Sequence, residues 1–223
     1  MAVVGIVIRR NMFDAPASPP DVSPLRLAFR DHRWQVLRIC GLNVGTAVTY
    51  YSLFVFAATW VAENTPVPRP LALNITTASI LTFLVILPMA AAASDRVGRK
   101  FVLLTGMTGC LLLAYPLVRL MHVGDPLLTA VGQMTFAAFL ACSMAPIPAA
   151  MCETFPHGVR VSAVSVGYGL AYAIFGGTAP AVALSLIQRT DDDLAFVWYI
   201  VAATALSLGV ALTVRERRDQ PLT

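Results

Sequence analysis

The stretch Ser94-Asp95-Arg96-Val97-Gly98-Arg99-Lys100 separates two long apolar runs in a chain that carries little other charge. Gly98 supplies the backbone freedom that a tight turn needs. Arginine and lysine beside apolar runs are typical of loops on the cytoplasmic side of a membrane. The stretch therefore predicts a short cytoplasmic turn between two membrane-spanning helices.

The composition also favours a protein embedded in lipid. Of the 223 residues, 57% are hydrophobic and 13% are charged, and the mean hydropathy is +0.72. A water-soluble domain of this length carries far more polar surface. The net charge of +4 is explained by basic cytoplasmic loops, because no interleaved aromatic and basic residues indicate a nucleic-acid face. We therefore expect the lipid bilayer, and no nucleic acid, as a partner.

Six apolar segments follow one another, and each is long enough to cross a bilayer, which takes about 20 residues. They cover residues 34–61, 71–93, 101–121, 127–151, 161–187 and 194–214. The sequence therefore predicts an all-α, polytopic membrane protein with a six-helix bundle at 34–214. The flanking parts are predicted to be the remnant of a preceding helix (1–10), a cytoplasmic loop (11–33) and a cytoplasmic tail (215–223).

The basic residues predict the orientation. When the chain is threaded through six crossings, all but three of the 16 Lys and Arg residues fall on one side. The exceptions are Arg69, Arg119 and Arg189. Because basic residues concentrate on the cytoplasmic side, we expect a multi-pass protein of the cell (plasma) membrane with both ends in the cytoplasm.

The order of residues in the charged turn resembles the signature loop of the major facilitator superfamily, whose pattern is G-x-x-x-D-R-x-G-R-[RK]. The sequence departs from it at the first glycine, where Ala91 stands. The matching positions are Asp95, Arg96, Gly98, Arg99 and Lys100.

Two later stretches resemble the metabolite:proton symporters of that superfamily, a group that includes carriers for proline and betaine, α-ketoglutarate, shikimate and citrate. Residues 153–160 match the pattern E-x-F-P-x-x-x-R, and residues 175–180 read F-G-G-T-A-P. The resemblance implies the C-terminal half of a twelve-helix transporter, helices seven to twelve. Gly169 departs from it, since the family commonly has Asn after the tyrosine.

The resemblance further implies a conformational latch at the cytoplasmic end. Asp95 would face a helix N-terminus in the first half of the transporter. Arg96 or Arg99 could pair with Glu153 at the end of the fourth apolar segment, and we expect a salt bridge between Arg99 and Glu153. The residues assigned to the latch are Asp95, Arg96, Gly98, Arg99, Lys100, Glu153 and Arg160.

Polar residues inside two apolar segments are candidates for the wall of a substrate cavity. Asn43, Thr46 and Tyr50 share a helix face at i, i+3, i+7 spacing, and Tyr168 and Tyr172 repeat the pattern at i, i+4. These groups either contact a substrate near the membrane midplane or only hydrogen-bond between helices.

The F-G-G-T-A-P run offers a second pair of interpretations. Gly176 and Gly177, followed by Pro180, serve either the close packing of helices or a hinge. Both interpretations remain open at the level of sequence.

No metal-ligand spacing, cofactor motif or nucleophile–base pair is present, so we expect neither an enzyme nor a cofactor. No Asp, Glu, Lys or His lies in the middle of an apolar segment, so a proton-binding group would belong to the other half of the transporter.

The predicted function is proton-coupled symport of a small organic acid or zwitterionic metabolite. One half supplies one wall of the cavity, so an N-terminal six-helix half or a second copy is the expected partner. The alternatives are a non-transporting six-helix interaction protein or an inactive fragment. An intramembrane enzyme is a third hypothesis, although no cluster of polar catalytic residues supports it.

Overall fold

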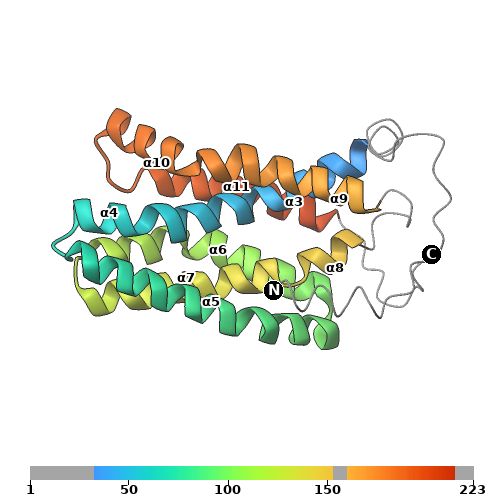
Figure 1. Ribbon diagram of the computed structural model, residues 1–223, viewed down its shortest axis with the longest axis horizontal. Coiled ribbons are helices and arrows are strands. Elements are labelled where there is room, and N and C mark those ends of the chain that lie inside the picture. Colours follow the sequence, from blue (N-terminus) through green and yellow to red (C-terminus); the bar gives the residue numbers. More distant parts are fainter. Residues whose placement is uncertain (1–32, 153–159, 214–223) are drawn as a thin grey trace, which may run out of the picture.

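The computed structural model describes residues 33–152 and 160–213, and within them the chain is helical apart from short turns (Figure 1). Six helical segments run along the long axis of the molecule and are joined at alternating ends (Figure 1). The predicted all-α architecture is confirmed for these residues. The predicted helix remnant at 1–10, nearly all of the loop at 11–33 and the tail at 215–223 lie outside them.

Three of the six segments are interrupted. The first and the fifth each contain a π-helical segment, and the fourth contains a turn. In chain order the elements are α3 (Arg33–Tyr51), η1 (Ser52–Phe56), α4 (Ala57–Asn64), α5 (Arg69–Val97), α6 (Arg99–His122), α7 (Pro126–Met144), α8 (Ile147–Cys152), α9 (Arg160–Leu170), η2 (Ala171–Gly176), α10 (Gly177–Thr190) and α11 (Phe196–Leu212).

The lengths of these segments fit a bilayer. Within the described residues, five of them are long and apolar enough to cross a membrane. The sixth, α11, has 17 residues, at the lower end of the range of about 17–25 that spans the hydrocarbon core. The predicted six crossings therefore correspond to six helical segments, of which α11 is the shortest.

The charged turn is tighter than the sequence predicts. Helix α5 continues to Val97 and helix α6 begins at Arg99, so only Gly98 interrupts the helical backbone. Gly98 has φ 120° and ψ 135°, a conformation that side-chain-bearing residues rarely adopt. The amide of Gly98 still bonds the carbonyl of Ser94 at 3.0 Å, which closes the last turn of α5.

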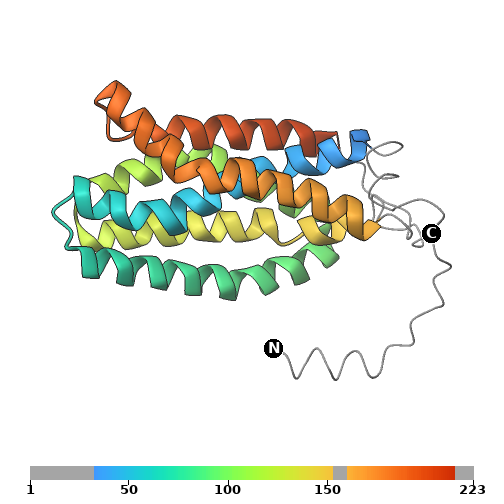
Figure 2. The ribbon, with the colours of Figure 1, turned by 45° about the horizontal axis from the view of Figure 1, so that its top comes forward.

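The first helical segment forms the centre of the bundle. In its most apolar stretch 67% of the residues are buried, against 28% for α5 and 22% for the fifth segment. Helix α3 packs against α11 and η2, while α7 packs against α5 and α6. In Figure 2, α5 forms one side of the bundle and α11 lies on the opposite side.

The outer surface of the bundle is apolar. On α5 the exposed side chains include Leu81, Leu84, Val85 and Met89. Water would disfavour such a surface, whereas lipid tails accept it. Because apolar side chains cover the outer surface as well as the interior, the chain has a high mean hydropathy although its interior is small.

Small residues bring the central helices together. A Cβ on Gly45 of α3 would lie 2.7 Å from the Cα of Thr204 on α11. A Cβ on Gly106 of α6 would lie 2.2 Å from the backbone nitrogen of Ser143 on α7. Both helix pairs are therefore in backbone contact, as is common where transmembrane helices associate.

Candidate functional site

The polar face predicted on α3 is buried in the bundle. Asn43 is 1% exposed and donates from Nδ2 to the carbonyl of Ile39 at 2.8 Å. The same nitrogen lies 3.5 Å from the sulfur of Met151. The Asn43 Oδ1 atom has no hydrogen-bond partner among the described residues. Thr46 donates to the carbonyl of Asn43 at 3.0 Å, so its oxygen keeps its capacity to accept.

The two predicted tyrosines of the fifth segment form a stacked pair. The rings of Tyr168 and Tyr172 are 4.2 Å apart with an interplanar angle of 24°. Tyr172 is half-buried, and its hydroxyl lies 4.0 Å from the sulfur of Met144. This hydroxyl also lies near the side chains of Thr46, Tyr168 and Tyr50.

The structure therefore brings together four of the five cavity candidates. Thr46 and Tyr50 come from α3, and Tyr168 and Tyr172 come from α9 and η2. Asn43 lies one turn of helix from Thr46 and contacts α8 instead. We call the four residues the tyrosine group.

Tyr50 connects the tyrosine group to α5 through further aromatic rings. Its ring lies 5.0 Å from Phe54 and 6.1 Å from Phe83, and Phe54 and Phe83 are 5.6 Å apart. All three pairs meet edge to face, the arrangement that the ring quadrupoles favour. We call these three residues the aromatic cluster.

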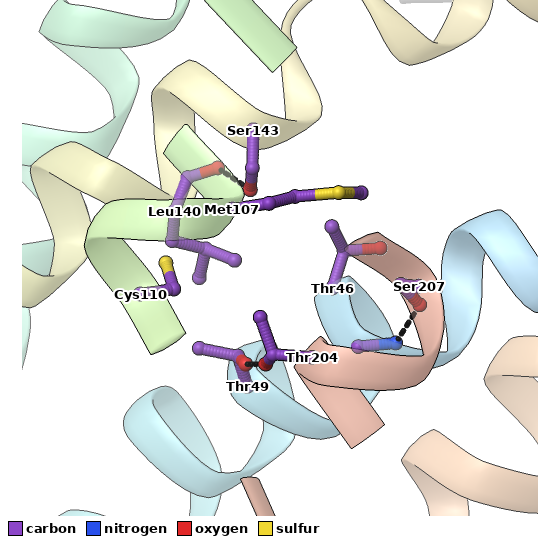
Figure 3. Close-up of a pocket in the computed structure, with 9 residues that line it drawn as sticks. Thr46, Thr49, Met107, Cys110, Leu140, Ser143, Thr204 and Ser207 are labelled. Carbon is purple, nitrogen blue, oxygen red and sulfur yellow. Dashed lines mark hydrogen bonds between the residues drawn. The ribbon is translucent and has the colours of Figure 1, made fainter. Parts of the chain in front are cut away.

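A small cavity of about 10 Å³ lies where α3, α6, α7 and α11 meet (Figure 3). This volume is close to the minimum that one buried water molecule needs, and it is far too small for a metabolite. Most of the lining groups are hydroxyls or small side chains. The lining residues are Gly45, Thr46, Thr49, Met107, Cys110, Leu140, Ser143, Thr204 and Ser207.

The hydroxyls of this cavity form hydrogen bonds both between helices and within one helix. Thr49 and Thr204 share a hydrogen bond of 3.5 Å between α3 and α11, and Ser143 donates to the carbonyl of Leu140 at 2.8 Å (Figure 3). Sequence reasoning did not select Thr204 or Ser207. Their Thr-x-x-Ser spacing places both hydroxyls on one face of the last apolar segment, and this pattern could have indicated them from the sequence.

The glycines of the F-G-G-T-A-P run differ in their surroundings. A Cβ on Gly176 would lie 2.8 Å from the ring of Tyr51, so Gly176 allows η2 to pack against α3. Gly177 has more room, because its nearest neighbour would be the Tyr172 carbonyl at 3.8 Å. Pro180 lies inside the first turn of α10. Gly176 thus has a packing role, and the hinge stays a prediction.

The predicted latch is described only in part. Arg99 Nε lies 3.9 Å from Asp95 Oδ1, within one turn of the chain on an exposed surface. Lys100 Nζ donates to the carbonyl of Leu212 at 3.0 Å and so joins α6 to the end of α11. Glu153 and the side chain of Arg160 lie outside the described residues. The Arg99–Glu153 bridge therefore stays a prediction.

Apolar helices that pack through small residues, with buried hydroxyls at the centre and charges at the helix ends, define a multi-pass helical membrane protein. The sequence profile of the family described as "Sugar (and other) transporter" matches residues 12–218. The chain belongs to this family. The predicted resemblance to the major facilitator superfamily is thereby confirmed.

Individual relatives agree with this assignment. The chain is 23% identical to the proline/betaine transporter of Escherichia coli K12 over 100% of its own length and 47% of that protein. It is 25% identical to the α-ketoglutarate permease of the same organism, over 97% of the chain and 51% of the permease. It is 27% identical to the ectoine/proline transporter ProP of Corynebacterium glutamicum, over 86% and 38%. The chain spans about half the length of these curated relatives.

Proposed function

We propose that the chain forms one half of a secondary transporter that moves a small organic acid or zwitterionic metabolite together with protons. The observation that carries this proposal is the match of nearly the whole chain, residues 12–218, to a transporter family. Relatives named for proline, betaine, ectoine and α-ketoglutarate support the class of substrate. A covalent reaction is not part of the proposal.

The tyrosine group supplies the chemistry of one wall of the substrate cavity. The faces of Tyr50, Tyr168 and Tyr172 attract cationic groups such as the ammonium of a zwitterion. The hydroxyl of Tyr172, which lies 4.0 Å from the sulfur of Met144, donates a hydrogen bond to a carboxylate. Since Tyr168 is 38% exposed and stacks on the half-buried Tyr172, this pair gives the group an accessible edge.

A transporter of this plan needs a second wall. Substrate sites in such folds lie at the interface between two halves. We propose a six-helix N-terminal half as the partner, or a second copy of the chain in its place. The partner half also contributes the intramembrane group that binds the proton.

Uptake by reconstituted vesicles tests the proposal. The chain is reconstituted alone and together with the N-terminal half of the Escherichia coli proline/betaine transporter, and labelled proline, glycine betaine and α-ketoglutarate are offered with and without an inward proton gradient. We expect gradient-dependent uptake from the paired halves. Uptake that is independent of the gradient would contradict proton coupling.

Two variants of the paired halves distinguish an effect on the tyrosine group from a general loss of folding or assembly. Tyr172→Phe should lower uptake, because it removes the hydroxyl that interacts with Thr46. Tyr115→Phe, on the outer part of α6, should leave uptake unchanged. Halves that bind each other but carry none of the substrates would favour the non-transporting interaction protein.

The proposed orientation in the plasma membrane has its own test. In a chain whose native cysteines are replaced, Val97→Cys at the end of α5 and Val123→Cys just after α6 place exposed thiols at opposite ends of the bundle. A membrane-impermeant maleimide applied to intact cells should label position 123 and spare position 97. Labelling at position 97 alone would reverse the orientation.

A further inference from the structure

The side chain of Gln133 joins three helical segments in the middle of the bundle. It lies on α7, is 1% exposed, and donates from Nε2 to the carbonyl of Leu53 on η1 at 3.0 Å. The same nitrogen donates to Thr76 Oγ1 on α5, also at 3.0 Å. Both N–H groups of the amide are thus committed to the protein itself.

The carbonyl of Leu53 needs a donor because of the π-helical backbone around it. In an α-helix this carbonyl would accept from the amide of Ala57, four residues later. Here the amide of Ala57 bonds the carbonyl of Ser52, five residues earlier. A carbonyl without a partner is strongly disfavoured at membrane depth, so the bond from Gln133 supports the π-helical register.

This register decides where the aromatic side chains lie. Phe54 follows Leu53 directly and contacts both Tyr50 and Phe83. A change from the π to the α register would rotate one part of the helix against the other by about 100°, the angle that one residue subtends. Such a rotation would remove Phe54 or Tyr50 from its present neighbours.

We infer that Gln133 is a positioning residue whose amide selects the π-helical register at Ser52–Phe56 and thereby fixes the aromatic cluster. The inference concerns the conformation of the chain and holds without transport. Its consequence for a substrate, through Tyr50 of the tyrosine group, rests on the proposed function.

Fluorine NMR of the full chain in lipid nanodiscs tests this inference directly. A trifluoromethyl-phenylalanine at position 54 reports the surroundings of the aromatic cluster, and one at the exposed position 101 of α6 serves as a control. Gln133→Met keeps the shape of the side chain and removes its donors. We expect a displaced or doubled resonance at position 54 and an unchanged one at position 101.

A second variant keeps the test decisive if Gln133→Met fails to fold. In Gln133→Glu the protonated carboxyl group can donate to the Leu53 carbonyl, whereas the ionised form has no donor. The resonance at position 54 should resemble the native one in acid and move as the pH rises, while the native chain shows no such change.

Thr76→Val separates the two hydrogen bonds, because it removes one acceptor and leaves the Leu53 bond in place. We expect the native resonance at position 54 in this variant. An unchanged resonance in Gln133→Met, or in Gln133→Glu at a pH at which the carboxyl group is ionised, would overturn the inference. Because the spectrum is recorded without substrate, the result does not depend on whether the chain transports.

Discussion

The hydroxyl of Ser207 on α11 bridges two backbone groups of α3 that belong to a single helical turn. It accepts from the amide of Gly45 at 2.7 Å and donates to the carbonyl of Gly41 at 2.6 Å. In an unmodified α-helix these two groups would bond each other directly. A side chain of one transmembrane helix thus bonds both the donor and the acceptor of one turn of its neighbour.

Replacing Ser207 with alanine should destabilise the bundle only modestly. The variant loses the bridge, while the amide of Gly45 and the carbonyl of Gly41 can bond each other within α3. We expect a loss of about 0.6 kcal/mol, with roughly 1.7 kcal/mol as the upper limit seen for such bonds in membranes. Thermal unfolding in detergent measures it. Ser185→Ala, which removes a bond within α10, is the matched control. A larger loss in the control would contradict the bridging role.

Gly98→Ala should destabilise the turn between α5 and α6. The φ of 120° at this position is costly for any residue with a Cβ, and strain of this kind is worth roughly 1–3 kcal/mol. Gly169→Ala provides the comparison, since a Cβ there meets nothing within 4 Å. The two variants should differ clearly in melting temperature. Equal melting temperatures would show that the turn is not constrained.

Trp60→Phe should loosen the turn between α10 and α11. The indole nitrogen of Trp60 donates to the carbonyl of Asp193 at 2.9 Å, and its ring packs on Phe196 at 5.2 Å. Phenylalanine keeps most of the packing and loses the hydrogen bond, which is worth about 0.5–1.5 kcal/mol. Hydrogen exchange at residues 191–195 should become faster. Trp198→Phe, on the exposed face of α11, should leave it unchanged.

The predicted salt bridge between Arg99 and Glu153 is open to a double-mutant cycle. Arg99→Ala and Glu153→Ala are measured singly and together by thermal unfolding of the chain in detergent. If the side chains pair, we expect a coupling energy of about 0.2–1 kcal/mol, as is usual for exposed ion pairs. Strictly additive effects would refute the bridge.

The sequence predicts the helices well, because lipid-facing segments need long apolar runs whatever their neighbours are. It also places the break at Gly98. It names Thr46, Tyr50, Tyr168 and Tyr172 as cavity candidates on two segments, and their role in a substrate cavity stays a prediction. The interruption between α7 and α8 was not expected, although Pro146 stands beside it. Proline removes a backbone donor and so weakens the preceding helical turn.

The two π-helical segments could not be predicted, because they depend on contacts between helices. The register at η1 is supported by Gln133, which is 80 residues away in the sequence. Gly176 of η2 packs against Tyr51, immediately before η1, from a distant part of the chain. Periodicity reveals the face of a helix but not which backbone carbonyl lacks a donor.

The π-helical turn at Ser52–Phe56 has a consequence for alignments between this chain and its relatives. Such a turn accommodates one residue more than an α-helical turn, so it absorbs a single insertion in the middle of a membrane span. In a relative that lacks the turn, an alignment without a gap that is correct in the first part of the span would be shifted by one residue in the second part. Assignments of function should therefore be carried across from relatives separately for α3 and for α4.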